Sequence, residues 1–357
     1  MKVSVFPRYS RLGASSRLRM YQAEANLRAL GLQPDIRPLF DDAYLRSIYA
    51  GRTAGGATLA ALWRRLGDLG QARHADLLWI EAELLPWLPW AIERAVLPRG
   101  VRYALDYDDA VFHRYDLHRV GPVRRLLGRK LDHMMAGSAL VTAGNRYLAD
   151  RAIRAGARRV EIVPTVVDTG IYFPAVRTGG DAPCIGWIGS PSTWTDYMAP
   201  MLPTLIETAS RSGACLMTVG AVRAAASNPL LEQRDWSEET EVARIQEMDI
   251  GVMPLDDSPW ARGKCGYKLI QYMACGLPVV ASPVGVNAEI VEHGVNGFLA
   301  TTHEEWDAAL TTLLRDPDLR RRMGAAGRRK VEEEYSLQVW GPRLAALLAD
   351  VADRARR

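Results

Sequence analysis

Short apolar runs rich in β-branched residues alternate with longer amphipathic runs along almost the whole chain, and this alternation constrains the fold more than any other feature. It is typical of βαβ units, in which helices join parallel strands. Residues 164–183, which are rich in proline and glycine and lack a helical period, interrupt the pattern before it starts again. The 357 residues also exceed the roughly 250–300 at which a single core stops growing. We therefore predict an α/β chain of two doubly wound halves, with 164–183 as the linker.

The runs also predict the elements of each half. In the first half, strands are expected at 2–6, 35–39, 77–80, 101–105, 140–143 and 160–163, with helices at 16–30 and 145–155. In the second half, strands are expected at 184–188, 215–219, 250–253, 279–281 and 297–299, with helices at 196–210, 238–247 and 267–274. The tail from Glu304 is expected to be helical, with breaks at Pro317 and in residues 335–342. Open parallel sheets bind ligands beyond the carboxyl ends of their strands, so we expect function there.

Composition and charge exclude several classes of protein. A formal net charge of +4 leaves no large surplus of cations for binding nucleic acid. The first residues lack the long apolar stretch of a signal peptide, and no uncharged apolar run reaches the length of about 18 residues that spans a bilayer. The cysteines form neither a CxxC motif nor a Cys/His cluster, which argues against a zinc site and a disulfide framework. We therefore expect a cytoplasmic protein.

A glycine-rich loop and the helix after it make residues 262–298 the most informative segment. The unpaired N–H groups at the start of a helix bind anions, so the loop from Gly263 is a candidate phosphate cradle. Lys264 and Lys268 are four residues apart and are expected to share one helix face, where both ammonium groups would bind the same anion. A solvated helix face is the alternative interpretation of the two lysines.

The stretches YMACGLPVVAS (272–282) and GVNAEIVEHGVNGFL (285–299) resemble the pattern of the retaining family 4 of nucleotide-sugar-dependent glycosyltransferases, which have the GT-B fold. The resemblance implies two facing Rossmann-like domains, with the acceptor bound by 1–166 and the nucleotide sugar by 167–335. It also implies that a helix at 336–357 packs back on the first domain. The expected reaction moves a hexosyl group from a UDP- or GDP-sugar to a saccharide or lipid-linked acceptor, with retention and without a cofactor or bound metal.

The chain departs from the family pattern at two glutamates, whose positions are occupied by Gly263 and Gln271. In the family the second glutamate holds the ribose of the donor, and the Gln271 amide can still hydrogen-bond to ribose hydroxyls. The loop at 187–198 also lacks the Arg and Lys of many members, so its hydroxyl and N–H groups are expected to bind phosphate. The predicted donor-binding set is Gly13, Ala14, Gly189, Ser190, Thr193, Gly263, Lys264, Lys268 and Gln271. A nucleotide-sugar epimerase and a catalytically silent partner subunit of the same fold remain alternatives.

The sequence DYDD (106–109) follows a predicted strand in the first half of the chain, which is expected to bind the acceptor, and it contains a cluster of carboxylates. Such a cluster can bind acceptor hydroxyls, accept a proton or bind a metal, whereas an Asp-rich turn that caps the next helix is the alternative. We predict Asp108 and Asp109 as catalytic residues, with His113 as the alternative base, because histidine side chains ordinarily change charge near neutral pH. Asp106 and Glu81 are predicted to bind the acceptor.

Aromatic and basic residues in the first half suggest peripheral contact with the inner face of a membrane. Core tryptophans and solvated arginines explain the same residues equally well. The residues concerned are Trp79, Trp87, Trp90, Arg64, Arg65, Arg124, Arg125, Arg129 and Lys130. In the second half, Trp236 is expected either to border the nucleotide base or to anchor a loop, and Glu241 to lie on a helix surface.

Overall fold

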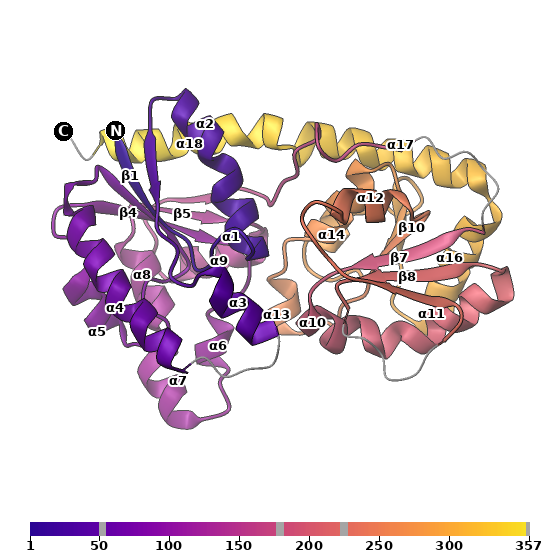
Figure 1. Ribbon diagram of the computed structural model, residues 1–357, viewed down its shortest axis with the longest axis horizontal. Coiled ribbons are helices and arrows are strands. Elements are labelled where there is room, and N and C mark those ends of the chain that lie inside the picture. The colour runs from indigo at the N-terminus through magenta and orange to yellow at the C-terminus, as the bar shows by residue number, and fades with distance from the viewer. Residues whose placement is uncertain (50–54, 176–181, 222–227, 355–357) are drawn as a thin grey trace. The chain divides into compact units, whose positions relative to one another are not determined.

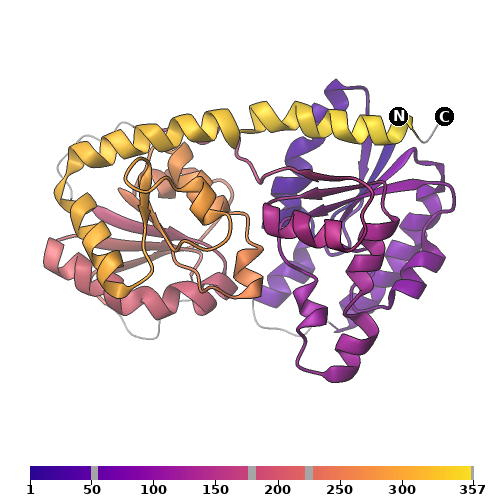
Figure 2. The same cartoon turned by 180° about the vertical axis from the view of Figure 1, so that it is seen from behind.

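The computed structural model describes residues 1–49, 55–175, 182–221 and 228–354 (Figure 1). Within these residues the chain divides into two compact units, seen from behind in Figure 2. Unit 1 comprises Met1–Thr165, Arg262–Cys265 and Trp340–Arg357, and unit 2 comprises Val166–Ala261 and Gly266–Val339. Four residues of the glycine-rich loop therefore belong with the N-terminal half of the chain.

Unit 1 is built on a six-stranded parallel sheet in the order β2-β1-β3-β4-β5-β6. Its strands are β1 (Lys2–Phe6), β2 (Gln33–Ile36), β3 (Leu77–Glu81), β4 (Arg102–Tyr107), β5 (Leu140–Ala143) and β6 (Val160–Ile162). Its helices are α1 (Ala14–Arg19), α2 (Glu24–Ala29), α3 (Asp42–Tyr49), α4 (Gly55–Gln71), α5 (Trp90–Val96), α6 (His113–Asp116), α7 (Gly121–Leu127), α8 (Lys130–Gly137) and α9 (Arg146–Arg154), with 3-10 turns at Tyr21–Ala23 and Ala72–His74. The register pairs Glu81 with Asp106, so these two carboxylates lie at the same edge of the sheet.

Unit 2 has a second six-stranded parallel sheet, in the order β12-β11-β10-β7-β8-β9. Its strands are β7 (Cys184–Ile188), β8 (Cys215–Val219), β9 (Leu231–Arg234), β10 (Ile250–Met253), β11 (Val279–Ala281) and β12 (Gly297–Leu299). Its helices are α10 (Pro191–Thr193), a π turn (Trp194–Met198), α11 (Ala199–Ser212), α12 (Glu241–Gln246), α14 (Tyr267–Ala274), α15 (Asn287–Ile290), α16 (His303–Arg315) and α17 (Pro317–Glu334). The short α13 (Pro259–Arg262) and the last helix, α18 (Leu337–Asp353), each include residues of both units. The predicted α/β architecture of two doubly wound halves is confirmed.

The structure corrects the predicted linker, because Val167 and Tyr172, which fall within it, are buried in the core of unit 2. The predicted breaks in the helical tail are confirmed, since α17 begins at Pro317, and residues 335 and 336 separate it from α18. Pro342 itself lies inside α18. The helix continues past this proline because Leu344 and Leu348 are buried in the core of unit 1. None of the described helices is both long enough and apolar enough to cross a bilayer.

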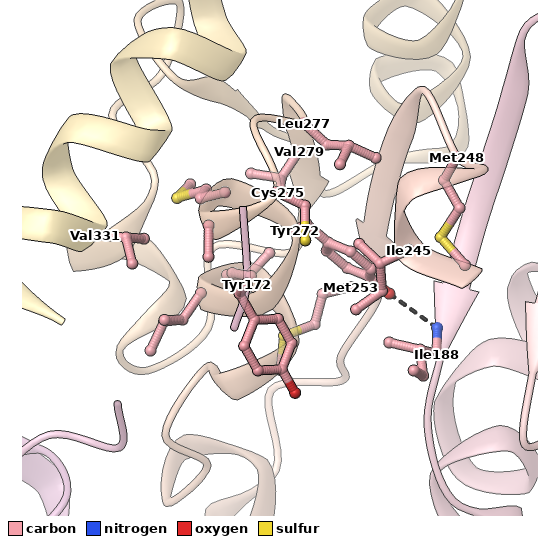
Figure 3. Close-up of a cluster of buried hydrophobic side chains, with 14 of the residues drawn as sticks. Tyr172, Ile188, Ile245, Met248, Met253, Tyr272, Cys275, Leu277, Val279 and Val331 are labelled. Atoms are coloured by element: carbon pink, nitrogen blue, oxygen red, sulfur yellow. Dashed lines mark hydrogen bonds between the residues drawn. The ribbon is translucent and has the colours of Figure 1, made fainter. Parts of the chain in front are cut away.

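Helix α14 is fastened to the sheet of unit 2 beside the end of β7. Figure 3 shows Tyr272 of α14 among the buried side chains of this core, with its hydroxyl next to Ile188. The Ile188 N–H donates to the Tyr272 hydroxyl over 2.9 Å. Because β7 ends at Ile188, this bond fixes α14 relative to the loop that starts at Gly189.

Candidate functional site

A pocket of about 50 Å³ lies in unit 1 beyond the carboxyl ends of β1, β3 and β4. It contains three carboxylates and two guanidinium groups, so it offers both acceptors and donors of hydrogen bonds. We call it the carboxylate pocket. Its lining residues are Arg8, Tyr9, Ser15, Glu81, Ala82, Tyr107, Asp108, Asp109, Val111 and Arg114.

Glu81, the last residue of β3, is held rigidly in the wall of this pocket. Its Oε2 accepts hydrogen bonds from the Arg8 N–H at 2.8 Å and from the Ser16 hydroxyl at 2.5 Å. Burial nevertheless raises the pKa of Glu81. The next residue, Ala82, has a φ of 56°, in the left-handed region that disfavours a residue with a Cβ. Backbone strain of this kind concentrates at functional sites, so the turn supports the assignment of this pocket.

Asp108 has the electrostatic properties of a proton-transfer residue. Burial, followed by the neighbouring Asp109 and Glu81 carboxylates, raises the pKa of Asp108 to about 8, although a hydrogen bond with Ser15 opposes the shift. Asp109 raises the pKa of Asp108 because two negative charges in one poorly solvated pocket repel each other, so the two carboxyl groups resist being ionised at the same time. A carboxyl group with a pKa close to neutral pH can both accept and return a proton.

The four residues Arg262–Cys265 are fastened to unit 1 beside this pocket. The Asn145 amide donates to the carbonyl groups of Gly263 and Lys264 at 3.0 and 2.9 Å, and the Cys265 thiol donates to the Asp108 carbonyl at 3.0 Å. The Lys264 ammonium group lies 3.8 Å from the Asp109 carboxylate. Lys264 therefore adds a positive charge next to the catalytic candidates.

This placement corrects the prediction that Lys264 and Lys268 share one helix face. Helix α14 begins only at Tyr267, because its N-cap residue Gly266 adopts a left-handed φ of 66° and turns the chain just before the helix. The missing glutamate at Gly263 also has a steric explanation. A Cβ at position 263 would lie 2.5 Å from the Cβ of Ala110 and 2.9 Å from its backbone nitrogen, so unit 1 leaves no room for a side chain.

Asp106 is not available to an acceptor, contrary to our prediction. It lies within β4, its side chain is 1% exposed, and Arg19 binds both of its oxygens at 2.7 and 2.8 Å. The Thr142 hydroxyl donates a further bond of 2.5 Å. Both carboxylate oxygens thus belong to a buried ion pair that joins α1 to the sheet.

His113 is also not placed to act as the base. Its Nδ1 lies 2.8 Å from the Asp116 carboxylate, and its Nε2 lies 2.8 Å from the Tyr147 hydroxyl. It does not line the carboxylate pocket. Both ring nitrogens are therefore engaged, one within α6 and the other with Tyr147 of α9.

Gly13 and Ala14 lie at the start of α1, which begins two residues before the predicted helix at 16–30. Gly13 is the N-cap of this helix, and its carbonyl accepts the Arg17 N–H at 2.9 Å. Ala14 is exposed at the first helical position. Their contact with donor phosphates stays a prediction.

In unit 2, the loop after β7 forms the candidate phosphate site. Ser190 and Thr193 cap each other's backbone N–H groups at the start of α10, which holds the loop in one conformation. The Lys268 ammonium group lies 5.7 Å from the centre of the Trp187 ring, a cation–π contact. A Cβ at Gly189 would lie 2.5 Å from the Trp187 ring and 2.8 Å from Cε of Lys268. Glycine at 189 therefore leaves the space that the Lys268 side chain occupies beside this loop.

Gln271 belongs to a buried polar network instead of an open ribose site. Its side chain is buried, and its amide donates to the Tyr172 hydroxyl at 3.2 Å. Tyr172 in turn donates to Glu241, whose second oxygen accepts the Trp236 indole N–H at 2.8 Å. The prediction of Glu241 on a helix surface is wrong, because these two bonds draw the carboxylate into the core. The bond to Glu241 shows that Trp236 anchors its loop, whereas its contact with a nucleotide base stays a prediction.

A second buried charge network, which sequence analysis missed, lies in unit 1. The Lys130 ammonium group is fully buried and lies 2.7 Å from Glu83 and 3.4 Å from Glu93. Burial, opposed by Lys130, raises the pKa of Glu93 to about 7. The network supports the carboxylate pocket, because Glu83 also binds the Arg8 guanidinium at 3.3 Å. Lys130, with Trp79 and Arg65, is at most 1% exposed, so these three residues of the predicted membrane-facing set cannot contact a membrane.

Acidic, histidine and cysteine side chains are the usual metal ligands of proteins. Among the residues that the structure describes, no group of three or more of them is arranged to hold a metal ion. The four cysteines are free thiols, Cys215 being half-buried and the others buried.

Comparison with known families identifies the segment that carries most of the unit 2 site. Residues 236–330 match the family described as glycosyl transferases group 1. This segment is similar to the group 1 glycosyl transferases. It contains Trp236, Glu241, Lys268 and Gln271.

Curated relatives match over parts of their length. The chain is 24% identical to D-inositol 3-phosphate glycosyltransferase of Segniliparus rotundus over 242 residues, which are 58% of this chain and 51% of that protein. It is 35% identical to N-acetyl-alpha-D-glucosaminyl L-malate synthase of Bacillus anthracis over 72 residues, which are 20% of this chain and 19% of that protein. The chain thus aligns with about half or less of each of these two relatives.

Solved structures match over nearly the whole chain. Sucrose-phosphate synthase from Thermosynechococcus elongatus aligns with 98% of this chain and 99% of its own, with a TM-score of 0.73 and 14% identity. HepE from Anabaena, solved in complex with UDP-glucose, aligns with 98% of this chain and 100% of its own, with a TM-score of 0.71 and 14% identity. At this identity the similarity shows the fold alone, and it confirms the predicted GT-B fold.

Proposed function

We propose that this chain is a retaining glycosyltransferase that moves a hexosyl group from a UDP- or GDP-sugar to a hydroxyl group of a glycan or lipid-linked acceptor. One observation carries the proposal: the segment that matches the group 1 glycosyl transferases holds Lys268 and the α14 framework beside the loop of Gly189, Ser190 and Thr193. A cation next to a rigid loop that carries hydroxyl groups suits a diphosphate.

Each unit is assigned one substrate. Unit 2 binds the nucleotide sugar, and Lys268 stabilises the negative charge that develops on the leaving diphosphate. Unit 1 binds the acceptor in the carboxylate pocket, where Glu81 and Asp109 accept hydrogen bonds from sugar hydroxyls. Asp108 accepts the proton of the attacking hydroxyl. Protein groups supply the charge stabilisation, so the reaction is proposed to proceed without a metal ion.

The experiment that tests this function measures sugar release from UDP-glucose and GDP-mannose by the purified chain, with EDTA present throughout. Slow hydrolysis to free sugar and nucleoside diphosphate is expected, because water can replace the acceptor, and NMR should find the released sugar in the anomeric configuration of the donor. Conversion of the donor to another nucleotide sugar would identify an epimerase. Absence of both reactions, with nucleotide still bound, would identify a silent subunit, and activity that requires added Mn²⁺ would contradict metal independence.

The role of Lys268 predicts a specific loss of affinity. Replacing Lys268 with Ala should weaken UDP or GDP binding about ten- to a hundredfold, because a charge-assisted hydrogen bond contributes about 1.5–3 kcal/mol. The nucleosides uridine and guanosine, which lack the diphosphate, should bind as before. Calorimetric titration measures both, with Lys330→Ala as the control, since Lys330 pairs with Glu292 on the surface of unit 2. Equal loss for nucleoside and nucleotide would place Lys268 elsewhere than at the diphosphate.

A further inference from the structure

One segment of unit 1 exposes basic and large aliphatic side chains side by side. We call residues 117–129, which join α6 to α8 and include α7, the basic tip. Leu117, Val120 and Leu126 are 57%, 44% and 65% exposed. Four arginines alternate with them, and the segment contains no acidic residue. Both Figure 1 and Figure 2 show it projecting from unit 1.

An aromatic side chain extends the exposed apolar surface of the basic tip. Trp87 is 50% exposed and lies edge-on to Tyr115 and His118, with ring centres 5.2 and 5.7 Å away. It has a φ of 66°, which is unfavourable for a bulky residue, so the fold holds an exposed indole in a strained backbone conformation.

A pocket of about 430 Å³ next to the tip adds positive charge. It is lined by Arg124, Arg129, Arg151 and Arg154, together with Asp116 and Asp132. Arg151 binds both aspartates, at 2.8 and 2.7 Å. In the described part of the chain, neither Arg129 nor Arg154 has a carboxylate at ion-pair distance. The pocket therefore carries a surplus of positive charge that suits phosphate groups.

We propose that the basic tip docks the chain on an anionic lipid bilayer. Arginines at such a surface bind the phosphate groups of the lipids, while Leu117, Val120, Leu126 and Trp87 enter the boundary between head groups and acyl chains. A lipid surface fits better than a protein partner, because the aliphatic side chains are interleaved with arginines along one projecting turn and do not form a continuous apolar face. This inference does not depend on glycosyl transfer.

The test is co-sedimentation of the full chain with vesicles. The chain should bind vesicles of equal parts phosphatidylcholine and phosphatidylglycerol, should bind phosphatidylcholine vesicles far less, and should be released by salt. Each basic residue near an anionic surface contributes roughly a fivefold factor, so R119Q/R125Q/R129Q should lower the partition coefficient about a hundredfold. The triple variant L117S/V120S/L126S should lower it by at least about tenfold, because three aliphatic side chains no longer leave water.

Matched controls separate the tip from general charge and apolar surface. R321Q/R322Q/R329Q removes three exposed arginines of α17, and L59S/W63S removes two exposed apolar residues of α4, of which Trp63 is 74% exposed. Both controls should bind the anionic vesicles like the unmodified chain, and urea unfolding should show that all variants fold. The proposal is overturned if the tip variants bind normally, if the control variants lose binding equally, or if the unmodified chain does not distinguish the two kinds of vesicle.

Discussion

Replacing Asp108 with Asn is expected to lower kcat for glycosyl transfer about 100- to 10,000-fold, the usual contribution of proton transfer to a positioned base. The variant should bind nucleoside diphosphate with unchanged affinity, because Asp108 is not among the proposed diphosphate ligands, and Lys268 and the loop after β7 belong to unit 2. The expected loss is therefore in turnover and not in donor binding. Rates with saturating donor and calorimetric titration of the nucleotide measure the two quantities.

The pH dependence of turnover should also identify Asp108 as the base. The pKa of Asp108 is raised to about 8, so the carboxyl group is mostly protonated at neutral pH and becomes a base as the pH rises through 8. Transfer by the unmodified chain should accelerate over this range and then level off. Asp108→Asn should lack this step. A profile in which both proteins accelerate alike would assign the ionisation to another group.

Thermal stability provides a readout that is independent of activity. Because the pKa of Asp108 is higher in the folded state than in the unfolded state, the folded chain holds its proton longer, and this group makes stability fall as the pH rises from about 4 to 8. Asn cannot ionise, so the melting temperature of Asp108→Asn, relative to the unmodified chain, should be higher at pH 8.5 than at pH 5.

Two variants complete the assignment. Asp150→Asn is the control, because Asp150 pairs with Arg146 on the exposed face of α9, and it should change neither rate nor pH profile. Asp109→Asn tests the neighbour that shares the carboxylate pocket and faces Lys264. Normal turnover in Asp108→Asn together with loss in Asp109→Asn would move the base to Asp109.

The sequence predicts the sheets well because their strands are short apolar runs buried on both faces. Every residue of β3 and β7 is buried, so these strands stand out by composition alone. Strand ends then locate Glu81 and Asp108, since ligands of parallel sheets bind beyond carboxyl ends. The edge strand β9 was missed, because its sequence LEQR is polar and only partly buried, which leaves no apolar run to detect.

Charged residues show where sequence reasoning fails. Asp106, Glu241 and Lys130 are expected at the surface by type, yet each is buried with an oppositely charged or hydrogen-bonding partner far away in the chain. The partner of Asp106, for example, is Arg19, 87 residues earlier. Chain order also assigns Lys264 to the C-terminal half, whereas contacts from Asn145 fix its backbone to unit 1. No local pattern encodes such pairings, because they depend on which strands become neighbours.

The buried network around Lys130 predicts the largest effect on stability. Replacing Lys130 with Met should lower the free energy of unfolding of unit 1 by about 3–5 kcal/mol, the usual cost of removing one partner of a buried ion pair. The variant leaves Glu93 without its cation and leaves Glu83 with only the Arg8 guanidinium at 3.3 Å, although both carboxylates are at most 1% exposed. It also removes the bond of 2.6 Å from the ammonium group to the Leu85 carbonyl. Urea unfolding measures the loss, and Lys2→Met, at an exposed lysine of the same unit, should be nearly neutral.

The pH dependence of this loss distinguishes electrostatics from packing. Burial already raises the pKa of Glu93 to about 7, and without Lys130 this carboxylate must take up a proton to stay buried, so the difference in stability between variant and unmodified chain should shrink as the pH falls from 8 towards 5. Adding Glu83→Gln and Glu93→Gln to Lys130→Met should recover part of the stability at pH 8, because the two carboxylate charges are then no longer buried without Lys130. A loss that is the same at every pH, and that the triple variant does not relieve, would show that the volume of the lysine side chain matters and its charge does not.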